Sequence, residues 1–231
     1  MREKVELTIL IPALNEEKTI EIVIKKAQEW LEKNDNIKGE ILISNNNSTD
    51  KTKEIAIKNN VRVIDVEKRG YGNALKEGIK NANGKYIIMG DADDSYNFLE
   101  IDEFYKELKN GNDLVIGNRF NNIQKGAMKW SHRYIGTPLL SYIISKKYKI
   151  KIKDINCGLR GMNKEKILEI DLQGEGMEFA SEMVIKAKKN NLKIKEIPIN
   201  FYKDKRGYKS HLNTIRDGIK HLKIILKQVK K

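Results

Sequence analysis

The fold can be predicted outward from one segment near the N-terminus, Leu7-Thr8-Ile9-Leu10-Ile11-Pro12-Ala13-Leu14-Asn15-Glu16. Its first five residues favour β-structure and are followed by Pro12, as expected of a buried strand that ends there. A helix is predicted between Glu16 and Lys33, because apolar residues recur there at helical spacing, at Ile20, Val23, Ile24, Ala27 and Leu31. The chain therefore opens with a strand, a polar loop and a helix.

The same alternation continues along the chain. Strands are predicted over residues 40–44, 61–66, 86–90, 114–117 and 192–199, and helices over residues 50–59, 70–82, 99–110, 177–189 and 212–229. Strands that alternate with helices of this length predict an α/β fold with a mainly parallel sheet covered on both faces. No linker, repeat or low-complexity segment interrupts the chain, so a single domain over residues 1–231 is expected.

The charge of the chain is strongly basic. Its 231 residues include 45 Lys and Arg against 32 Asp and Glu, a formal net charge of +13. Such an excess indicates a polyanionic partner, which is nucleic acid, an acidic membrane face or a phosphorylated substrate. No apolar run approaches the roughly eighteen residues that a membrane-spanning helix needs, and no secretory signal pattern is present. We therefore expect a cytosolic protein.

Several common site types are excluded by the motifs. Cys157 is the only cysteine, so an internal disulfide and a multi-cysteine metal cluster are ruled out, and a small semi-buried apolar role is expected for it. A P-loop pattern is missing. The segment Gly70-Tyr71-Gly72-Asn73 follows the third strand and has Leu75 where a dinucleotide fingerprint needs its third glycine. It is expected to open the third helix, whose free N–H groups could face a phosphate.

Polar residues follow three of the predicted strands, at residues 12–16, 45–50 and 90–95. Ligands of open parallel sheets bind beyond the carboxyl ends of the strands, so these stretches should line one edge. In Asp91-Ala92-Asp93 the two carboxylates point to the same side of an extended segment and can converge on one cation. A hard ion such as Mg²⁺ or Mn²⁺ takes one or two carboxylates and completes its shell with water and phosphate oxygens. A solvated loop or a helix cap is the alternative reading of this triplet.

Taken together, the motifs resemble the family 2 glycosyltransferases with a GT-A fold, and within them the dolichol-phosphate mannose or glucose synthase branch. The resemblance covers nearly the whole chain. The blocks that carry it are Pro12-x-x-Asn15-Glu16, Asn45-Asn46-Asn47-Ser48-Thr49-Asp50, Arg69-Gly70-Tyr71-Gly72-Asn73-Ala74, Asp91-Ala92-Asp93, Gly117-Asn118-Arg119-Phe120, Cys157-Gly158-Leu159-Arg160-Gly161, Gly176-Met177-Glu178-Phe179-Ala180-Ser181-Glu182, and His211-Leu212 with Arg216-Asp217-Gly218.

The resemblance implies a donor half over residues 1–118 and an acceptor half over residues 119–231. It implies that Asp91 and Asp93 hold Mg²⁺ or Mn²⁺ with the sugar diphosphate, and that Asp93 and Arg119 act in catalysis. The full set of donor-binding residues implied is Pro12, Asn15, Glu16, Asn46, Asp50, Asp91, Ala92, Asp93 and Ser95.

One motif departs from the pattern of the family. The second-strand motif there usually begins with two acids, and here Asn45 and Asn46 replace them, which removes charge near the donor base. The choice between a GDP and a UDP donor therefore stays open.

The acceptor can be inferred from its charge. A lipid phosphate is already anionic and needs no base, only cations that position it, and Arg suits bidentate phosphate contacts. The resemblance places Arg119, Arg133 and Arg206 beside that phosphate. The predicted reaction moves a hexose from GDP-mannose, UDP-glucose or UDP-N-acetylglucosamine to a polyprenyl or dolichyl phosphate. One alternative is a sugar-hydroxyl acceptor with Glu178 as the base, and another is a basic nucleic-acid-binding module.

Much of the basic charge lies in the C-terminal segment. Residues 203–231 hold ten Lys and Arg against two Asp, and an apolar stripe runs through Ile215, Ile219, Leu222, Leu226 and Val229. Such a helix either lies on an anionic membrane face or packs on the core with its lysines solvated. Residues 135–145 form a second candidate interfacial helix, with core packing as its alternative. We expect peripheral docking at the cytoplasmic face of the membrane, with or without a small membrane subunit, and no nucleic acid partner.

Overall fold

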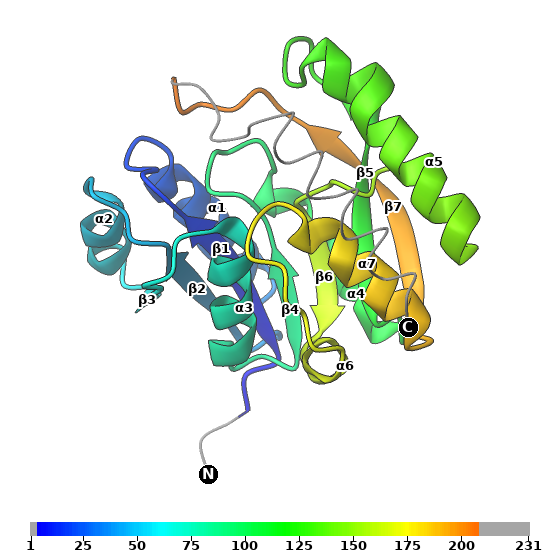
Figure 1. Ribbon diagram of the computed structural model, residues 1–231. Helices are drawn as coiled ribbons and strands as arrows, with labels where there is room; N and C mark the ends of the chain where they lie inside the picture. Colours follow the sequence, from blue (N-terminus) through cyan, green and yellow to red (C-terminus); the bar gives the residue numbers. More distant parts are fainter. Residues whose placement is uncertain (1–3, 208–231) are drawn as a thin grey trace.

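The computed structural model describes residues 4–207 of the chain (Figure 1). Its centre is one seven-stranded sheet with the strand order β3-β2-β1-β4-β6-β5-β7. The strands are β1 (Leu7–Ala13), β2 (Gly39–Asn45), β3 (Arg62–Asp65), β4 (Tyr86–Met89), β5 (Leu114–Ile123), β6 (Arg160–Asn163) and β7 (Ile194–Phe201).

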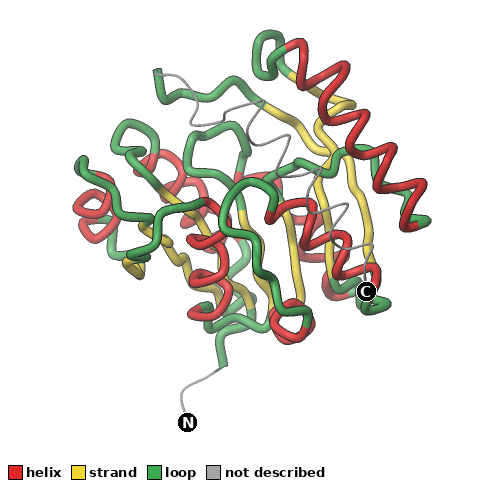
Figure 2. Tube along the Cα trace, in the orientation of Figure 1, coloured by secondary structure: helices red, strands yellow, loops and turns green. Residues whose placement is uncertain are grey.

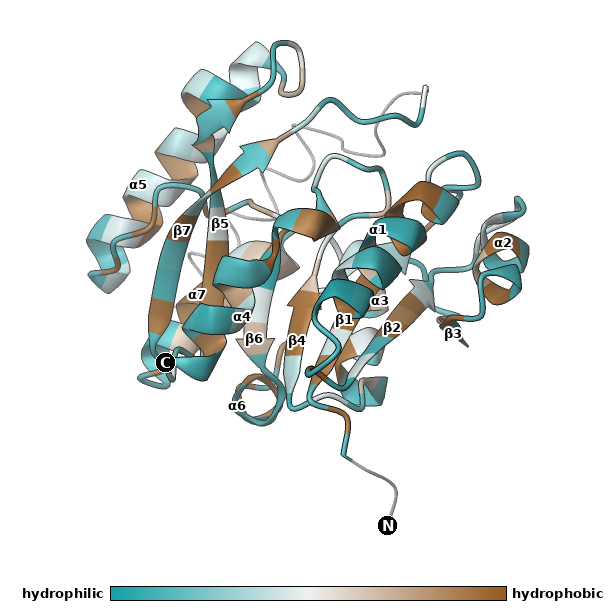
Figure 3. Cartoon of the chain, turned by 180° about the vertical axis from the view of Figure 1, so that it is seen from behind, coloured by the Kyte–Doolittle hydropathy of each residue, from teal (hydrophilic) through white to brown (hydrophobic). Residues whose placement is uncertain are grey.

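Helices pack on both faces of this sheet (Figure 2). Helices α3 and α7 lie in front of the strands in Figure 1, and α1 and α4 lie in front in the reverse view of Figure 3. The predicted α/β architecture is therefore confirmed. The helices are α1 (Ile20–Lys33), α2 (Thr52–Lys58), α3 (Tyr71–Asn81), η1 (Phe98–Glu100), α4 (Asp102–Lys109), η2 (His132–Gly136, one π-turn), α5 (Thr137–Tyr148), α6 (Lys164–Glu169) and α7 (Phe179–Lys189).

The sheet is mainly parallel, as predicted, with one strand that runs the other way. β1 pairs in parallel with β2 and β4, β2 with β3, and β5 with β7. The exception is β6, which is antiparallel to both β4 and β5 and was not predicted. Its sequence, Arg-Gly-Met-Asn, lacks the β-branched run that marks a strand. It forms because its two neighbours offer it a complete set of ladder partners.

Three of the predicted boundaries that differ from the structure have a clear local reason. β1 continues through Pro12 to Ala13, because these residues stay in parallel register with Ser44 and Asn45 of β2. The first helix begins at Ile20 rather than at residue 16, since the residues between them form a turn. β5 extends well past residue 117 and pairs with β7 again beyond an irregularity between residues 118 and 122.

The first strand, β1, lies at the centre of the hydrophobic core. All seven residues of β1 are buried, and this strand sits third in the sheet with helices on both faces. Four of the five predicted apolar positions of α1, at residues 20, 23, 24 and 27, are buried in the same core as β1, together with Trp30. Because β1, β2 and β4 are adjacent and parallel, the loops after them meet at one edge of the sheet.

Within residues 4–207, none of the helices is both long and apolar enough to cross a membrane. The basic C-terminal helix predicted over residues 212–229 lies outside the described residues.

Candidate active site

The loops after β1 and β2 are tied together by side chains at the carboxyl edge. Asn15, which has a left-handed backbone (φ 56°), donates its N–H to Ser48 Oγ at 3.1 Å and accepts from the Thr49 N–H at 2.8 Å. The N–H of Glu16 donates to Thr52 Oγ1 at 2.7 Å. The structure thus brings together two of the three polar stretches that the sequence placed at this edge.

Asp50 reinforces the same junction. Its Oδ1 accepts from the N–H and the hydroxyl of Thr52, at 3.0 and 2.5 Å, and its Oδ2 accepts from the N–H of Glu17 at 3.1 Å. Pro12 is buried within β1. The observed bonds of Asp50 therefore start α2 and hold the two loops in register, so its donor role stays a prediction.

The two asparagines that depart from the family pattern have partners that require amides. Asn46 is buried; its Oδ1 accepts from the N–H of Gly70 at 2.7 Å and its Nδ2 donates to the carbonyl of Lys68 at 3.0 Å. Asn45 donates from Nδ2 to Asp65 Oδ1 at 2.8 Å. A carboxylate at either position has no N–H to donate, and at residue 45 it would repel Asp65. The two asparagines therefore hold the end of β3 and the loop after it, and they do so with amide groups that carry no charge.

Asp91 and Asp93 follow β4 at the same edge. Asp91 Oδ1 accepts from the hydroxyl of Tyr71 at 2.9 Å. Its Oδ2 lies only 2.7 Å from where a Cβ would stand at Gly158, so only glycine fits there without displacing the carboxylate. Asp93 Oδ1 accepts from both the N–H and the hydroxyl of Ser95, at 3.0 and 2.5 Å. Each carboxylate is thus held in one orientation.

Electrostatics favour a cation at this pair. Burial, and next the negative charge of Asp93, raise the pKa of Asp91 from 3.8 to about 6. Among residues 4–207 no cluster of three or more His, Cys, Asp or Glu is arranged to hold a metal. Two carboxylates and no third protein ligand fit a hard divalent ion that takes its remaining ligands from water and a diphosphate. The residues present therefore fit Mg²⁺ or Mn²⁺.

Arg119 is anchored by a buried acid. Its Nε and Nη2 each lie 2.7 Å from an oxygen of Asp154, whose side chain is fully buried, and its guanidinium lies 5.1 Å from the centroid of the Phe201 ring. The positive charge of Arg119 lowers the pKa of Asp91 and so opposes the effect of burial. The guanidinium is therefore close enough to the carboxylate pair to interact with it electrostatically.

The other two predicted arginines contact different residues. Arg206 bonds carboxylates of the donor edge, with Nη2 2.8 Å from Asp93 Oδ2 and Nη1 3.3 Å from Glu16 Oε1. Arg133 lies on η2, with its guanidinium 5.3 Å from the centroid of the neighbouring Tyr134 ring. Each of the three arginines thus has different partners, and their role at an acceptor phosphate stays a prediction.

The start of α3 packs against a loop, so one of the N–H groups that were expected to be available to a phosphate already has a partner. The N–H of Asn73 donates to the carbonyl of Glu175 at 3.3 Å, and a Cβ at Gly72 would lie 2.4 Å from the carbonyl oxygen of Gly174. Glu178 holds this loop, because its Oε1 accepts from the N–H groups of residues 175 and 176. The glycines of the Gly70–Asn73 segment thus allow close packing against another loop.

Sequence reasoning missed four residues of the site: Tyr71, Asp154, Gly158 and Arg160. Arg160 is fully buried and donates to three carbonyls, those of Cys157, Ile155 and Ala180, at 2.8–2.9 Å. It fixes the loop that carries Asp154 and Gly158. The block Cys157–Gly161 marked this region by resemblance, but nothing in its spacing revealed which partners its residues have.

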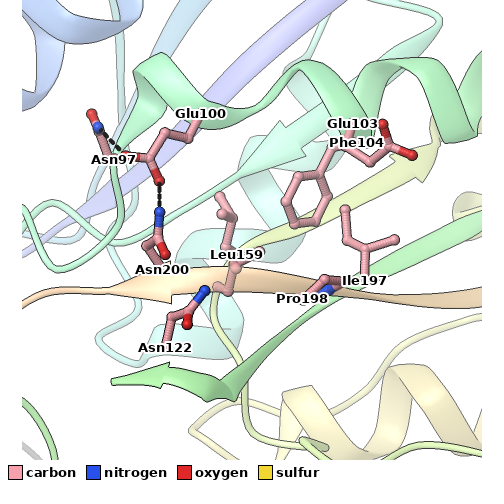
Figure 4. A pocket seen from close by; sticks show the side chains of 10 residues that line it. Asn97, Glu100, Glu103, Phe104, Asn122, Leu159, Ile197, Pro198 and Asn200 are labelled. Atoms are coloured by element: carbon pink, nitrogen blue, oxygen red, sulfur yellow. Dashed lines mark hydrogen bonds between the residues drawn. The ribbon is translucent and has the colours of Figure 1, made fainter. Parts of the chain in front are cut away.

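A hollow of about 260 Å³ lies between η1–α4 and β7 (Figure 4). Glu100 accepts there from the side-chain amides of Asn97 and Asn200, at 2.8 and 2.9 Å. None of the predicted site residues lines this hollow. The carboxyl edge is therefore the better candidate for the active site.

A mainly parallel sheet that carries an Asp-Ala-Asp carboxylate pair at its carboxyl edge is the arrangement of a GT-A glycosyltransferase. The chain belongs to glycosyl transferase family 2, whose family model matches residues 8–170. The resemblance and the enzyme class predicted from the sequence are thereby confirmed, and the nucleic-acid-binding alternative is dropped.

Known relatives and structures agree with this assignment. The low-salt glycan biosynthesis hexosyltransferase Agl6 of Haloferax volcanii is 34% identical over 95% of this chain, which spans only 53% of that protein. The dolichyl-phosphate beta-glucosyltransferase of Saccharomyces cerevisiae is 27% identical over 87% of this chain and 68% of its own length. Glucosyl-3-phosphoglycerate synthase of Mycobacterium tuberculosis, solved with Mn²⁺, UDP and phosphoglyceric acid, superposes with a TM-score of 0.76 at 19% identity, over 97% of this chain and 78% of that one. This last likeness concerns the fold.

Proposed function

We propose that this glycosyltransferase moves a hexose from a nucleotide sugar to a polyprenyl or dolichyl phosphate with the help of a divalent cation. The observation that carries the proposal is the oriented pair Asp91 and Asp93, at the edge where the loops of β1, β2 and β4 meet. The yeast relative named for dolichyl phosphate supports the acceptor class.

The donor side of the reaction uses the carboxylate pair. Asp91 and Asp93 would hold Mg²⁺ or Mn²⁺, with Tyr71 and Ser95 orienting the two carboxylates. A divalent cation bound there neutralises the charge that develops on the leaving diphosphate. Glu16, Asn15 and Asn46 lie in the adjoining loops, so the nucleotide is proposed to bind along them.

The acceptor side needs cations and no base. An oxygen of the lipid phosphate attacks the anomeric carbon, the bond from that carbon to the diphosphate oxygen breaks, and the nucleoside diphosphate leaves. Arg119, Arg133 and Arg206 are proposed to position the phosphate. Glu178, the candidate base for a hydroxyl acceptor, already accepts two N–H groups of its own loop through Oε1. That bonding gives Glu178 a role in holding its loop, and the choice between the two acceptor classes is left to experiment.

An exposed apolar face on η2 and α5 supports docking on a membrane. We call it the α5 face; its members are between 52% and 67% exposed, and they are Trp130, Tyr134, Ile135, Leu139 and Tyr142. Lys129, Lys146 and Lys147 lie in the same segment, and α5 stands at the outer side of the molecule beside β5 and β7 (Figure 1). Aromatic and apolar side chains among lysines suit an anionic membrane surface. Docking at the cytoplasmic face, alone or with a small membrane subunit, is part of the proposal.

Glu178→Gln separates the two acceptor classes. Gln keeps a side-chain oxygen for the loop N–H groups but cannot act as a base. Transfer to polyprenyl phosphate should stay within about threefold of wild type, because a phosphate acceptor needs no base. Transfer to a hydroxyl acceptor should fall about 10²–10⁴-fold, the usual contribution of a general base. Transfer to a soluble sugar that is strong in wild type and lost in Glu178→Gln would favour the hydroxyl acceptor instead.

A further inference from the structure

Arg206 places a cation between two loops of the donor edge. Its guanidinium bonds Asp93 Oδ2 at 2.8 Å and Glu16 Oε1 at 3.3 Å, and its side chain is only 12% exposed. The residue comes from the segment after β7, far along the chain from both acids. It therefore neutralises negative charge at the place where the donor diphosphate would arrive.

The backbone of this segment is fixed to the loop after β4. The N–H of Tyr202 donates to the carbonyl of Ser95 at 3.0 Å, and the N–H of Lys205 donates to the carbonyl of Asp93 at 3.1 Å. Lys205 Nζ also lies 2.8 Å from Asp94 Oδ2. With the backbone held in this way, only the Arg206 side chain has to move to release Asp93.

Arg206 and a divalent cation need the same atom. Asp93 Oδ1 already accepts two bonds from Ser95, so Oδ2 is the oxygen that remains for a metal, and Arg206 is bonded to it. The guanidinium is not fully satisfied there. Its Nε is buried without a hydrogen-bond partner in the described part of the chain, with Asp204 Oδ1 at 3.5 Å. A partly bonded cation can exchange partners at lower cost than a fully bonded one.

We propose that Arg206 is a positioning residue that competes with the divalent cation for Asp93 Oδ2 and is released when cation and donor diphosphate bind together. The released guanidinium is then available to a phosphate, so the donor binds before the acceptor phosphate. This inference rests on the proposed function for the identity of that phosphate, but the competition itself does not depend on any acceptor.

The test is a titration of the purified chain with Mn²⁺, without nucleotide, followed by the electron paramagnetic resonance signal of free Mn²⁺. Arg206→Gln should bind Mn²⁺ about fivefold more tightly than wild type, the effect of removing one competing ion pair of moderate strength. Lys205→Gln is the matched control, because it removes the same charge from the same segment without touching Asp93 or Glu16. It should stay within about twofold of wild type, because Lys205 is 57% exposed and its partner Asp94 keeps a second ion pair, with Lys26 at 2.6 Å.

Tighter metal binding is a gain that damage to the fold would not produce. Arg206→Lys keeps the charge and should bind Mn²⁺ as wild type does, which distinguishes competition from a change of shape. Unchanged or weaker Mn²⁺ binding in Arg206→Gln would overturn the inference, as would an equal gain in Lys205→Gln. Failure of the proposed function would show differently, as wild-type protein that binds Mn²⁺ and nucleotide yet makes no lipid product.

Discussion

Each oxygen of the Asp93 carboxylate has its own partner, Ser95 on one side and Arg206 on the other. Asp93→Asn keeps an oxygen for Ser95 but removes the charge that a metal needs. Turnover should fall by at least about 100-fold, the usual cost of losing one group that stabilises transition-state charge. Circular dichroism should show an intact fold, and turnover near the wild-type rate would refute the metal assignment.

The pKa of Asp91 predicts how stability depends on pH. Because its pKa of about 6 in the folded protein lies above the ordinary 3.8, the folded state binds this proton more tightly than the unfolded chain does. The free energy of unfolding should therefore fall as pH rises from about 4 to 6 and then level off. Above pH 6 the wild-type protein must keep a buried carboxylate ionised, and Asp91→Asn has no such group. The variant should therefore be more stable than wild type by about 1–3 kcal/mol above pH 6.

Urea denaturation at pH 4 and pH 7.5 measures this difference. The advantage of Asp91→Asn should largely disappear at the lower pH, because pH 4 lies close to the ordinary pKa of 3.8 and most of the difference in proton binding develops above it. Asp35→Asn, a change at an exposed aspartate, should shift stability by less than about 0.5 kcal/mol at either pH. An Asp91→Asn advantage that is the same at both pH values would contradict the assigned pKa.

A substitution at Asn46 tests whether the amide is needed for its two hydrogen bonds. Asn46→Asp keeps the bond from Gly70 but loses the one to the Lys68 carbonyl. We expect a loss of about 1–3 kcal/mol in the free energy of unfolding at pH 7.5, the cost of leaving a buried polar group unpaired. Asn47→Asp is the control. Asn47 is exposed and has a left-handed backbone, which aspartate also tolerates, so this change should leave the free energy of unfolding nearly unchanged.

Sequence reasoning found the carboxylates of this site but not their partners. Asp91 and Asp93 were predicted because they follow an apolar strand, a local signal. Tyr71 is 20 residues away from Asp91, and Arg206 is much farther along the chain from Asp93. Only the strand order, which no local pattern contains, brings these residues together.

The strands and helices show the same limit. The strands β1 and β4 and the helix α1 were predicted because burial imposes a regular apolar pattern on them. β6 was missed because its four residues have little strand propensity of their own. They are held by the two neighbouring strands and by the hydrogen bonds of Arg160, the first residue of β6. β5 was predicted too short, because its second part has no apolar run and pairs with β7 only after an irregularity.

The α5 face predicts membrane binding through two exposed side chains. Replacing both Leu139 and Tyr142 by Gln should weaken binding to vesicles containing anionic phospholipid about tenfold or more, because each change removes on the order of 1 kcal/mol of apolar burial. Leu168→Gln is the control: that residue is 49% exposed on α6, away from the α5 face (Figure 1). Sedimentation with vesicles measures the effect, and equal binding by all three proteins would contradict the docking surface.

The two proposed halves of the chain share one sheet, since β4 of the first pairs with β6 of the second. Donor binding should therefore stabilise the whole molecule. At 100 times its dissociation constant, the correct nucleoside diphosphate with Mn²⁺ should add about 2.7 kcal/mol to the free energy of unfolding. A thermal-shift comparison of GDP with UDP identifies the base, and a shift with neither nucleotide would count against a nucleotide-sugar donor.

One assay measures directly whether the protein transfers a hexose to a lipid phosphate. Purified protein is incubated with Mn²⁺, polyprenyl phosphate and radiolabelled GDP-mannose, UDP-glucose or UDP-N-acetylglucosamine, and the label that enters the organic phase is counted. We predict label in the organic phase with one of these donors, dependent on the lipid phosphate and absent with Asp93→Asn. If none of the three donors delivers label to the lipid, the claim is contradicted.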